Sequence, residues 1–191
     1  MGHLPPGSRL SVPALAREFG VSRSPIRDAV LHLVRDGLGE ETLNRGAIVR
    51  TFSPAHLLSL YEGMEALEGM AARLAADRSD AAVHKRLTDM VREHHHDIAG
   101  TGSRWPVDAA DAFHGEIWAA AASPVLARML EDLQGQVRLA MCSASLGGGN
   151  AHAIEDHREL LDAIAAGDAD ASEAAARRHV VRLRAMLWDV V

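Results

Sequence analysis

Apolar residues near the N-terminus recur at the spacing expected of two short helices. Between Val12 and Phe19 they return at intervals of three and four, which places them on one helical face. A second pattern begins near Ser24, has Pro25 in its first turn, where a missing N–H does no harm, and continues to Gly37. The sequence therefore predicts a helix, a tight turn and a second helix.

Residues 40–50 carry the pattern of a β-hairpin. The turn-forming sequence Asn44-Arg45-Gly46 separates two short runs of β-branched and apolar residues, as a two-stranded hairpin requires. We expect this hairpin to form the wing of a winged helix-turn-helix. Pro54 follows and ends the strand-like sequence, so we place one domain at residues 1–53 and a second at residues 54–191.

The remainder of the chain has helical periodicity and no strand-like segment. Glycine-rich breaks and N-cap residues divide it into six predicted helices, at residues 54–77, 79–99, 106–121, 123–146, 150–166 and 168–190. Aromatic residues make up only 4% of the chain and hydrophobic residues 48%, which favours helices packed through small side chains over a β-sandwich. The expected fold class is therefore mostly α, with a small winged helix-turn-helix domain joined to an all-α bundle.

Charge is distributed unevenly along the chain. The formal net charge is −6, but residues 1–52 contain seven arginines against five acidic residues, and the remainder is acidic. A basic tip of this kind can approach phosphate groups while an acidic body stays in solvent. Cys142 is the single cysteine, no secretory signal opens the chain, and no apolar stretch reaches the ~20 residues of a membrane span. We therefore expect a cytoplasmic protein with no membrane partner.

The start of the second predicted helix has the residues of a DNA-reading element. In a helix-turn-helix, the N-terminal residues of the second helix reach base edges in the major groove. Arg23 and Arg27 are four residues apart, so both can project from one face, and each can make a bidentate contact to guanine. Ser22 and Ser24 can position the phosphate backbone. The alternative is an ordinary capped helix start with two solvated arginines.

This segment belongs to a longer stretch that resembles the GntR superfamily of bacterial transcription regulators. The matching residues are Pro6 to Leu10, Leu15-Ala16, Phe19 to Val30, Leu33, Gly37-Leu38 and Arg45 to Val49. The resemblance implies that Arg23, Ser24 and Arg27 make most of the contact with a double-stranded DNA operator and that Ser22 supports them. It also implies that Arg45 and Gly46, at the tip of the wing, touch the minor groove or the DNA backbone.

Members of this superfamily have a further helix before the Pro-Gly turn. This chain begins at Met1, already at that turn, so we expect the first helix to be missing and the apolar faces of Leu15 and Leu33 to be exposed. Two explanations stay open: the true start lies upstream, or this chain is a paralogue defective in DNA binding.

Three of the eleven histidines lie on the apolar stripes of separate predicted helices: His114, His157 and His179. One such residue is usually a hydrogen-bonded core histidine, but three in one bundle would each need a buried partner. Asp111, three residues before His114, can share its face. Three imidazoles and one carboxylate suit a divalent metal ion, and the sequence does not choose among zinc, nickel, manganese and iron.

The second half of the chain resembles the FCD ligand-binding domain of the FadR subfamily. The resemblance covers residues 56–188 and rests on Tyr61 to Gly69, Ala72 to Ala76, Phe113-His114, Asp156 to Ile164, Gly167-Asp168 and His179. It implies a bundle of six or seven helices that binds a metal ion and a small organic acid. The family's acidic ligand lies four residues before the first histidine, where this chain has Ala110, so Asp111 is taken as its substitute. The family often has an effector-binding arginine where Met64 stands, which leaves a more apolar effector open.

Two classes of function remain possible. The first is a homodimeric, effector-gated transcription regulator that reads an operator with dyad symmetry and is not an enzyme. The second is a metal-dependent helical enzyme acting on a small organic acid, since a metal-bound water can be activated. The sequence lacks a second acidic residue placed as a general base, a Gly-rich phosphate loop and a GxSxG nucleophile motif, so the regulator is favoured.

Overall fold

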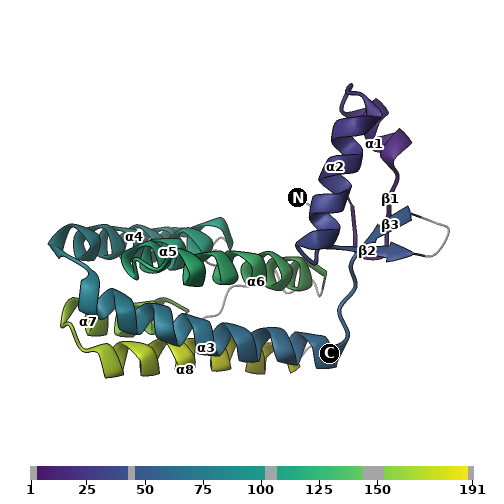
Figure 1. Cartoon of the computed structure of the whole chain (residues 1–191). Helices are drawn as coiled ribbons and strands as arrows, with labels where there is room; N and C mark the ends of the chain where they lie inside the picture. Colours follow the sequence, from purple (N-terminus) through teal and green to yellow (C-terminus); the bar gives the residue numbers. More distant parts are fainter. Residues whose placement is uncertain (1–3, 43–45, 102–106, 144–152, 189–191) are drawn as a thin grey trace.

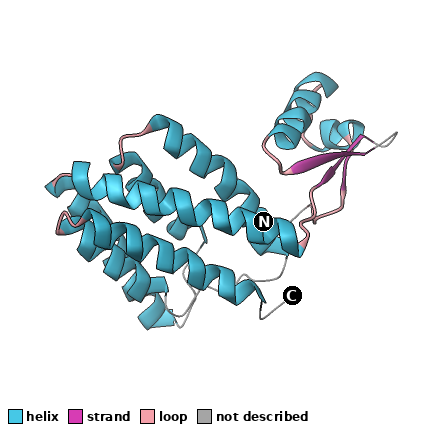
Figure 2. Cartoon of the chain, turned by 60° about the horizontal axis from the view of Figure 1, so that its bottom comes forward, coloured by secondary structure: helices cyan, strands magenta, loops and turns pink. Residues whose placement is uncertain are grey.

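A computed structural model describes residues 4–42, 46–101, 107–143 and 153–188. Within these residues the chain forms a small N-terminal head and a larger helical bundle (Figure 1). Figure 2 shows the same division, with the strands confined to the head and helices making up the rest. None of the described helices combines the length and apolar character needed to cross a bilayer.

The head is a winged helix-turn-helix. Its elements are β1 (Arg9–Leu10), α1 (Val12–Glu18), α2 (Arg23–Arg35), β2 (Gly39–Thr42) and β3 (Gly46–Val49). The two predicted helices and the hairpin are confirmed, whereas β1 is a strand that the sequence pattern did not predict. It pairs antiparallel with β3, which gives a three-stranded sheet in the order β1-β3-β2. Two residues are too few to produce a recognisable alternation, which explains why β1 was missed.

The expected exposure of Leu15 and Leu33 is wrong. Leu15 is 9% exposed and belongs to the core of the head, and Leu33 packs against that core. The large apolar side chains that do face solvent in the head are Leu4, Phe19, Val21 and Leu31, which are 40–65% exposed. Leu31 lines a groove between α1, α2 and the sheet. Helical periodicity shows which residues share a face of a helix, but whether that face is buried depends on the elements that pack against it. The sequence did not predict β1, which covers one side of the head.

The bundle consists of six described helices, as predicted. They are α3 (Pro54–Arg78), α4 (Ala81–Thr101), α5 (Val107–Ala120), α6 (Pro124–Ser143), α7 (Ala153–Ala165) and α8 (Ala169–Trp188). Helix α3 is the central element, because it packs against α5, α6, α7 and α8. Figure 1 shows α4, α5 and α6 along one side of the bundle and α3, α7 and α8 along the other.

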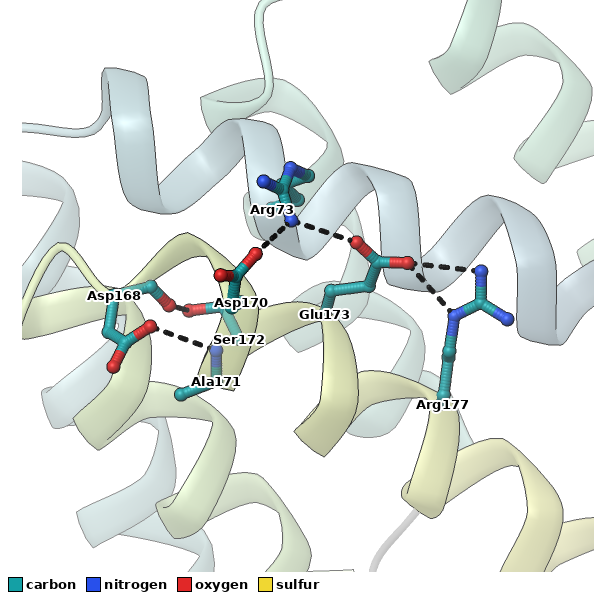
Figure 3. Close-up of polar contacts among 7 residues, drawn as sticks. All are labelled: Arg73, Asp168, Asp170, Ala171, Ser172, Glu173 and Arg177. Atoms are coloured by element: carbon teal, nitrogen blue, oxygen red, sulfur yellow. Dashed lines mark hydrogen bonds and ion pairs between the residues drawn. The ribbon is translucent and has the colours of Figure 1, made fainter.

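Helices α3 and α8 approach each other closely along their length. Gly69 on α3 is buried, and a Cβ atom there would lie 3.0 Å from the Cγ atom of Arg177. Beside this contact, Arg73 reaches Asp170 at 2.5 Å and Glu173 at 3.1 Å, and Glu173 also accepts from Arg177 (Figure 3). Such partly exposed ion pairs contribute little stability, so packing of small residues holds this pair of helices together.

Among the described residues, helix α6 of the bundle contacts the head at several points. Leu38 packs near Gly135 of α6, and the side chain of Gln136 lies against Gly37, just after the C-terminal end of α2. Leu139 packs against the core of the head. Figure 1 shows α2 standing over the C-terminal half of α6, with its N-terminal end directed away from the bundle.

Candidate functional site

Three buried histidines from three helices meet inside the bundle. His114 lies on α5, His157 on α7 and His179 on α8, and they are 7%, 1% and 3% exposed. One nitrogen of each ring can be chosen so that all three lie within 4.8 Å of one another. The three residues that the sequence singled out on separate helices are thus brought together by the fold.

The apolar stripe of each helix positions its histidine. On α7, Leu160 and Ile164 lie on the same face as His157 and pack in the core of the bundle. Phe113, next to His114, stacks on the ring of His157 with centroids 4.4 Å apart. Packing therefore limits the rotation of the imidazoles before any ligand is bound.

A buried carboxylate that the sequence analysis did not assign lies beside the cluster. Glu68 on α3 is 3% exposed, and its Oε1 lies 3.4 Å from Nδ1 of His114. Its Oε2 accepts a hydrogen bond from Nε1 of Trp118 at 3.1 Å. Burial alone would raise the pKa of the Glu68 carboxyl, but His114 and Trp118 lower it below its ordinary value, so this group is ionised.

The same pairing raises the basicity of His114. Burial alone would lower the pKa of His114, but the charge of Glu68 and the hydrogen bond to it raise this pKa above its ordinary value. With Nδ1 of His114 facing the Glu68 carboxylate at 3.4 Å, Nε2 is the nitrogen left to bind a ligand.

A second buried carboxylate holds His179. Asp156 is 2% exposed, its Oδ2 lies 3.3 Å from Nδ1 of His179, and its Oδ1 accepts from Arg182. Burial, with a further contribution from the charge of His114, lowers the pKa of His179 to about 3, so this imidazole is neutral near pH 7. Its Nδ1–H donates to Asp156 and its Nε2 carries the free lone pair.

The structure does not bring Asp111 into the histidine cluster. Its Oδ1 accepts from Nε2 of Gln134 at 2.5 Å and its Oδ2 from Nη1 of Arg138 at 2.6 Å, both on α6. It is half-buried rather than buried. A spacing of three residues places Asp111 near the same side of α5 as His114, but there the carboxylate meets α6 and its two donors. In this structure Asp111 forms an interhelical ion pair, and its charge helps to raise the pKa of the neighbouring His114.

A signal in the sequence could have found Glu68. Leu60, Met64 and Glu68 follow one another at intervals of four and are all buried, so Glu68 is an acidic residue on an apolar stripe. An ionisable residue on an apolar stripe is the same signal that identifies the three histidines.

The donor set fits a divalent metal ion. Three imidazoles supply nitrogen ligands of the kind that zinc and other first-row divalent ions take. The two neighbouring carboxylates, Glu68 and Asp156, are ionised or hydrogen-bonded in the interior and carry negative charge that a divalent cation would offset. Carboxylates bonded to the second nitrogen of a ligating histidine are the usual support of a metal site in proteins.

The predicted DNA-contacting residues lie at the free end of the head. Arg23, Ser24 and Arg27 are exposed on the first turns of α2, and the N-cap residue Ser22 makes no cap hydrogen bond with its side chain. Gly46 is exposed at the start of β3 with φ of +80°, and its carbonyl accepts from the hydroxyl of Thr42. Arg45 lies outside the described residues.

Comparison with known proteins agrees with this architecture. The family profile "FCD domain" matches residues 59–182, and the profile "Bacterial regulatory proteins, gntR family" matches residues 1–49. The chain belongs to the GntR family of transcription regulators with an FCD domain.

Two relatives illustrate this membership. The chain is 32% identical over 182 residues to a probable D-xylose utilization operon transcriptional repressor of Paenarthrobacter nicotinovorans, covering 94% of this chain and 79% of that protein. It is 28% identical over 209 residues to the HTH-type transcriptional regulator LutR of Bacillus subtilis, covering 97% and 94%.

Solved structures share the fold of this GntR-family chain. E. coli McbR/YncC superposes with a TM-score of 0.82 at 23% identity, covering 98% of this chain and 90% of that one. A putative transcriptional regulator GntR from Rhodococcus sp. RHA1 gives a TM-score of 0.78, also at 23% identity, covering 100% and 91%.

Proposed function

We propose that this GntR-family regulator binds its DNA operator as a homodimer and that a small ligand, bound beside a divalent metal ion, changes its operator affinity. His114, His157 and His179 would hold the ion. The observation that carries the proposal is the convergence of three buried imidazoles, with ring centroids 4.7–5.2 Å apart, in the domain opposite a head that exposes Arg23 and Arg27.

The head supports the DNA-binding part of the proposal. Arg23 and Arg27 lie one turn apart at the free N-terminal end of α2, the end that enters the major groove in helix-turn-helix proteins. The exposed serines Ser22 and Ser24 flank Arg23 and are suited to phosphate contacts. A dimer with twofold symmetry would read two half-sites of a pseudo-palindrome.

The carboxylates support the metal-binding part. Glu68 and Asp156 each face Nδ1 of a histidine, which leaves Nε2 of His114 and of His179 as the nitrogens that would bind the ion. When bound, the ion would supply open coordination positions to an oxygen donor of a small organic acid. The residues of this chain would orient the ligands, exclude water and balance the charge of the ion.

The geometry gives the enzymatic alternative little support. Catalysis by a metal-bound water requires a base within reach of the reacting proton. The two buried carboxylates described beside the centre are each tied to an imidazole and to a second donor, Trp118 for Glu68 and Arg182 for Asp156. A regulatory centre that binds without turnover accounts for this arrangement.

The test measures metal binding and DNA binding on the same protein. After treatment with a chelator, the chain is titrated calorimetrically with zinc, nickel, manganese and iron(II), and its affinity for DNA from the region upstream of its own gene is measured by fluorescence anisotropy. We expect binding of one ion per chain and a metal-dependent DNA affinity that His157→Ala abolishes. The control His84→Ala removes a histidine that bonds Ser79 outside the cluster and leaves metal binding unchanged.

Three outcomes would each reject part of the proposal. Equal metal binding by the wild type and His157→Ala would refute the proposed metal centre. Absence of DNA binding even at low salt would refute the regulator and favour a paralogue defective in DNA binding. DNA affinity that is unchanged by metal and by candidate acids would refute the gating by a ligand.

A further inference from the structure

We infer that helix α6 couples the metal centre to the DNA-reading helix, with Asp111 as the contact on the sensor side and Gln136 as the contact on the head side. The inference rests on the proposed function, because it specifies how occupancy of that centre reaches α2. Three sets of contacts in the structure support it.

On the sensor side, α5 is fastened to α6 next to a histidine of the centre. Asp111 lies one turn before His114 on α5, and its two carboxylate oxygens accept from Gln134 at 2.5 Å and from Arg138 at 2.6 Å. The two donors are themselves one turn apart on α6. Both oxygens are engaged by the same helix, so a shift of α5 at His114 is transmitted to α6 rather than absorbed by a side chain.

On the head side, the same stretch of α6 meets the end of α2. A Cβ atom on Gly37 would lie only 2.8 Å from Cδ of Gln136, so backbone and side chain are in close contact there. Gly37 has φ of +75°, a conformation that favours glycine, and it forms the turn directly after α2. One turn further on, Leu139 packs against the core of the head, which includes Val30 of α2.

The two sets of contacts lie within two turns of α6, from residue 134 to residue 139. A helix of this length is a rigid element, so its two faces move together. Helix α2 then acts as a lever, because its 13 residues span about 20 Å from the turn at Gly37 to Arg23. A tilt of about 5° at its base would displace the arginine end by about 2 Å, enough to disturb bidentate base contacts.

The experiment uses zinc alone and the full chain, and it does not require a known operator. Hydrogen exchange of backbone amides is measured by mass spectrometry with and without zinc, for the wild type, Asp111→Asn and Gln136→Ala, and zinc affinity is measured by calorimetry. In the wild type we expect zinc to slow exchange in the segment from α2 to β2 by about 5- to 150-fold, the usual range of coupling between sites. Both variants should bind zinc and lose this response in the head.

A matched variant on α6 controls for nonspecific effects of substitution. Arg128→Ala removes an exposed arginine whose described partner is Asp132 on the same helix, and it should leave the response of the head unchanged. Zinc binding without any change of exchange in the head of the wild type, or an undiminished change in both variants, would overturn the coupling through α6. Absence of zinc binding to the wild type would instead refute the proposed metal centre.

Discussion

Replacing Glu68 with glutamine tests whether the buried carboxylates serve the metal centre. The glutamine side chain keeps the size and can still accept from Trp118, but it removes the negative charge 3.4 Å from Nδ1 of His114. Loss of a carboxylate behind a ligating histidine typically weakens metal affinity 10- to 100-fold, which is about 1.4–2.7 kcal/mol. We expect a loss of this size for zinc, measured by competition with a chromophoric chelator.

Thermal unfolding gives an independent measure of the same quantity. At zinc concentrations 100 times the wild-type dissociation constant, binding stabilises the wild type by about 2.7 kcal/mol and the Glu68→Gln variant by about 0.4–1.4 kcal/mol. For a chain of this size these values correspond to increases in Tm of roughly 5–11 °C and 1–6 °C. Without zinc the variant should be less stable than the wild type near pH 7, because it removes the buried carboxylate that pairs with His114 and holds the pKa of that imidazole high.

The control for this experiment is Glu65→Gln on the same helix. Glu65 is half-buried and pairs at 3.7 Å with Arg177 and Arg184, away from the histidines. Zinc affinity should therefore be unchanged in this variant. Equal zinc affinity of Glu68→Gln and the wild type would show that the charge of Glu68 does not act on the centre, and the reasoning from His114 would fail.

Three further predictions concern the head and the scaffold. Arg23→Ala and Arg27→Ala should each weaken binding to a specific operator by about 1–3 kcal/mol in fluorescence anisotropy, whereas Arg128→Ala on α6 should not, and equal losses in all three would contradict direct readout. Leu160→Ala, at a residue 1% exposed in the core, should lower the free energy of unfolding in urea by about 2–5 kcal/mol, and a smaller loss would mean that the cavity collapses. Hydrogen bonds from two backbone amides lower the pKa of Asp80, at the start of α4, below 3.8, so its stabilising effect is present above that pH and is lost in acid. Asp80→Ala should therefore lower Tm at pH 7, and the difference from the wild type should shrink as the pH falls below 3.8; a constant difference would contradict the assignment.

The fold could be predicted from the sequence to within a few residues at most helix ends. Long periodic segments separated by glycines and N-cap residues define each bundle helix locally, and Asp168, which accepts from the backbone amide of Ala171, is one such cap. The strand β1 could not be predicted, because two residues acquire a strand conformation only by pairing with β3. The exposure of Leu15 was wrong for the same reason, since burial depends on what the fold places against a face.

In the candidate site, too, the sequence predicted what depends on one helix and missed what depends on how the helices pack. The three histidines were identified from their own helices, because each lies on an apolar stripe. Their partners were not, because Glu68 and His114 are far apart in sequence and only the packing of α3 on α5 brings them together. The donors that Asp111 meets on α6, Gln134 and Arg138, could not be predicted either, because spacing along one helix says nothing of the side chains on the next.

Small residues line the faces of α3 and α8 that pack together in the bundle. Four buried alanines on α3, together with Gly69, line the face that packs in the bundle, and two more lie on α8: Ala71, Ala72, Ala75, Ala76, Ala175 and Ala176. Helices with such faces approach closely, and α3 and α8, which carry Glu68 and His179, pack against each other. Burying two carboxylates and three imidazoles costs stability, and replacing them with apolar residues is often neutral or stabilising. A bundle selected for stability alone would keep the alanines and lose these charges, so their presence together supports the proposed metal centre.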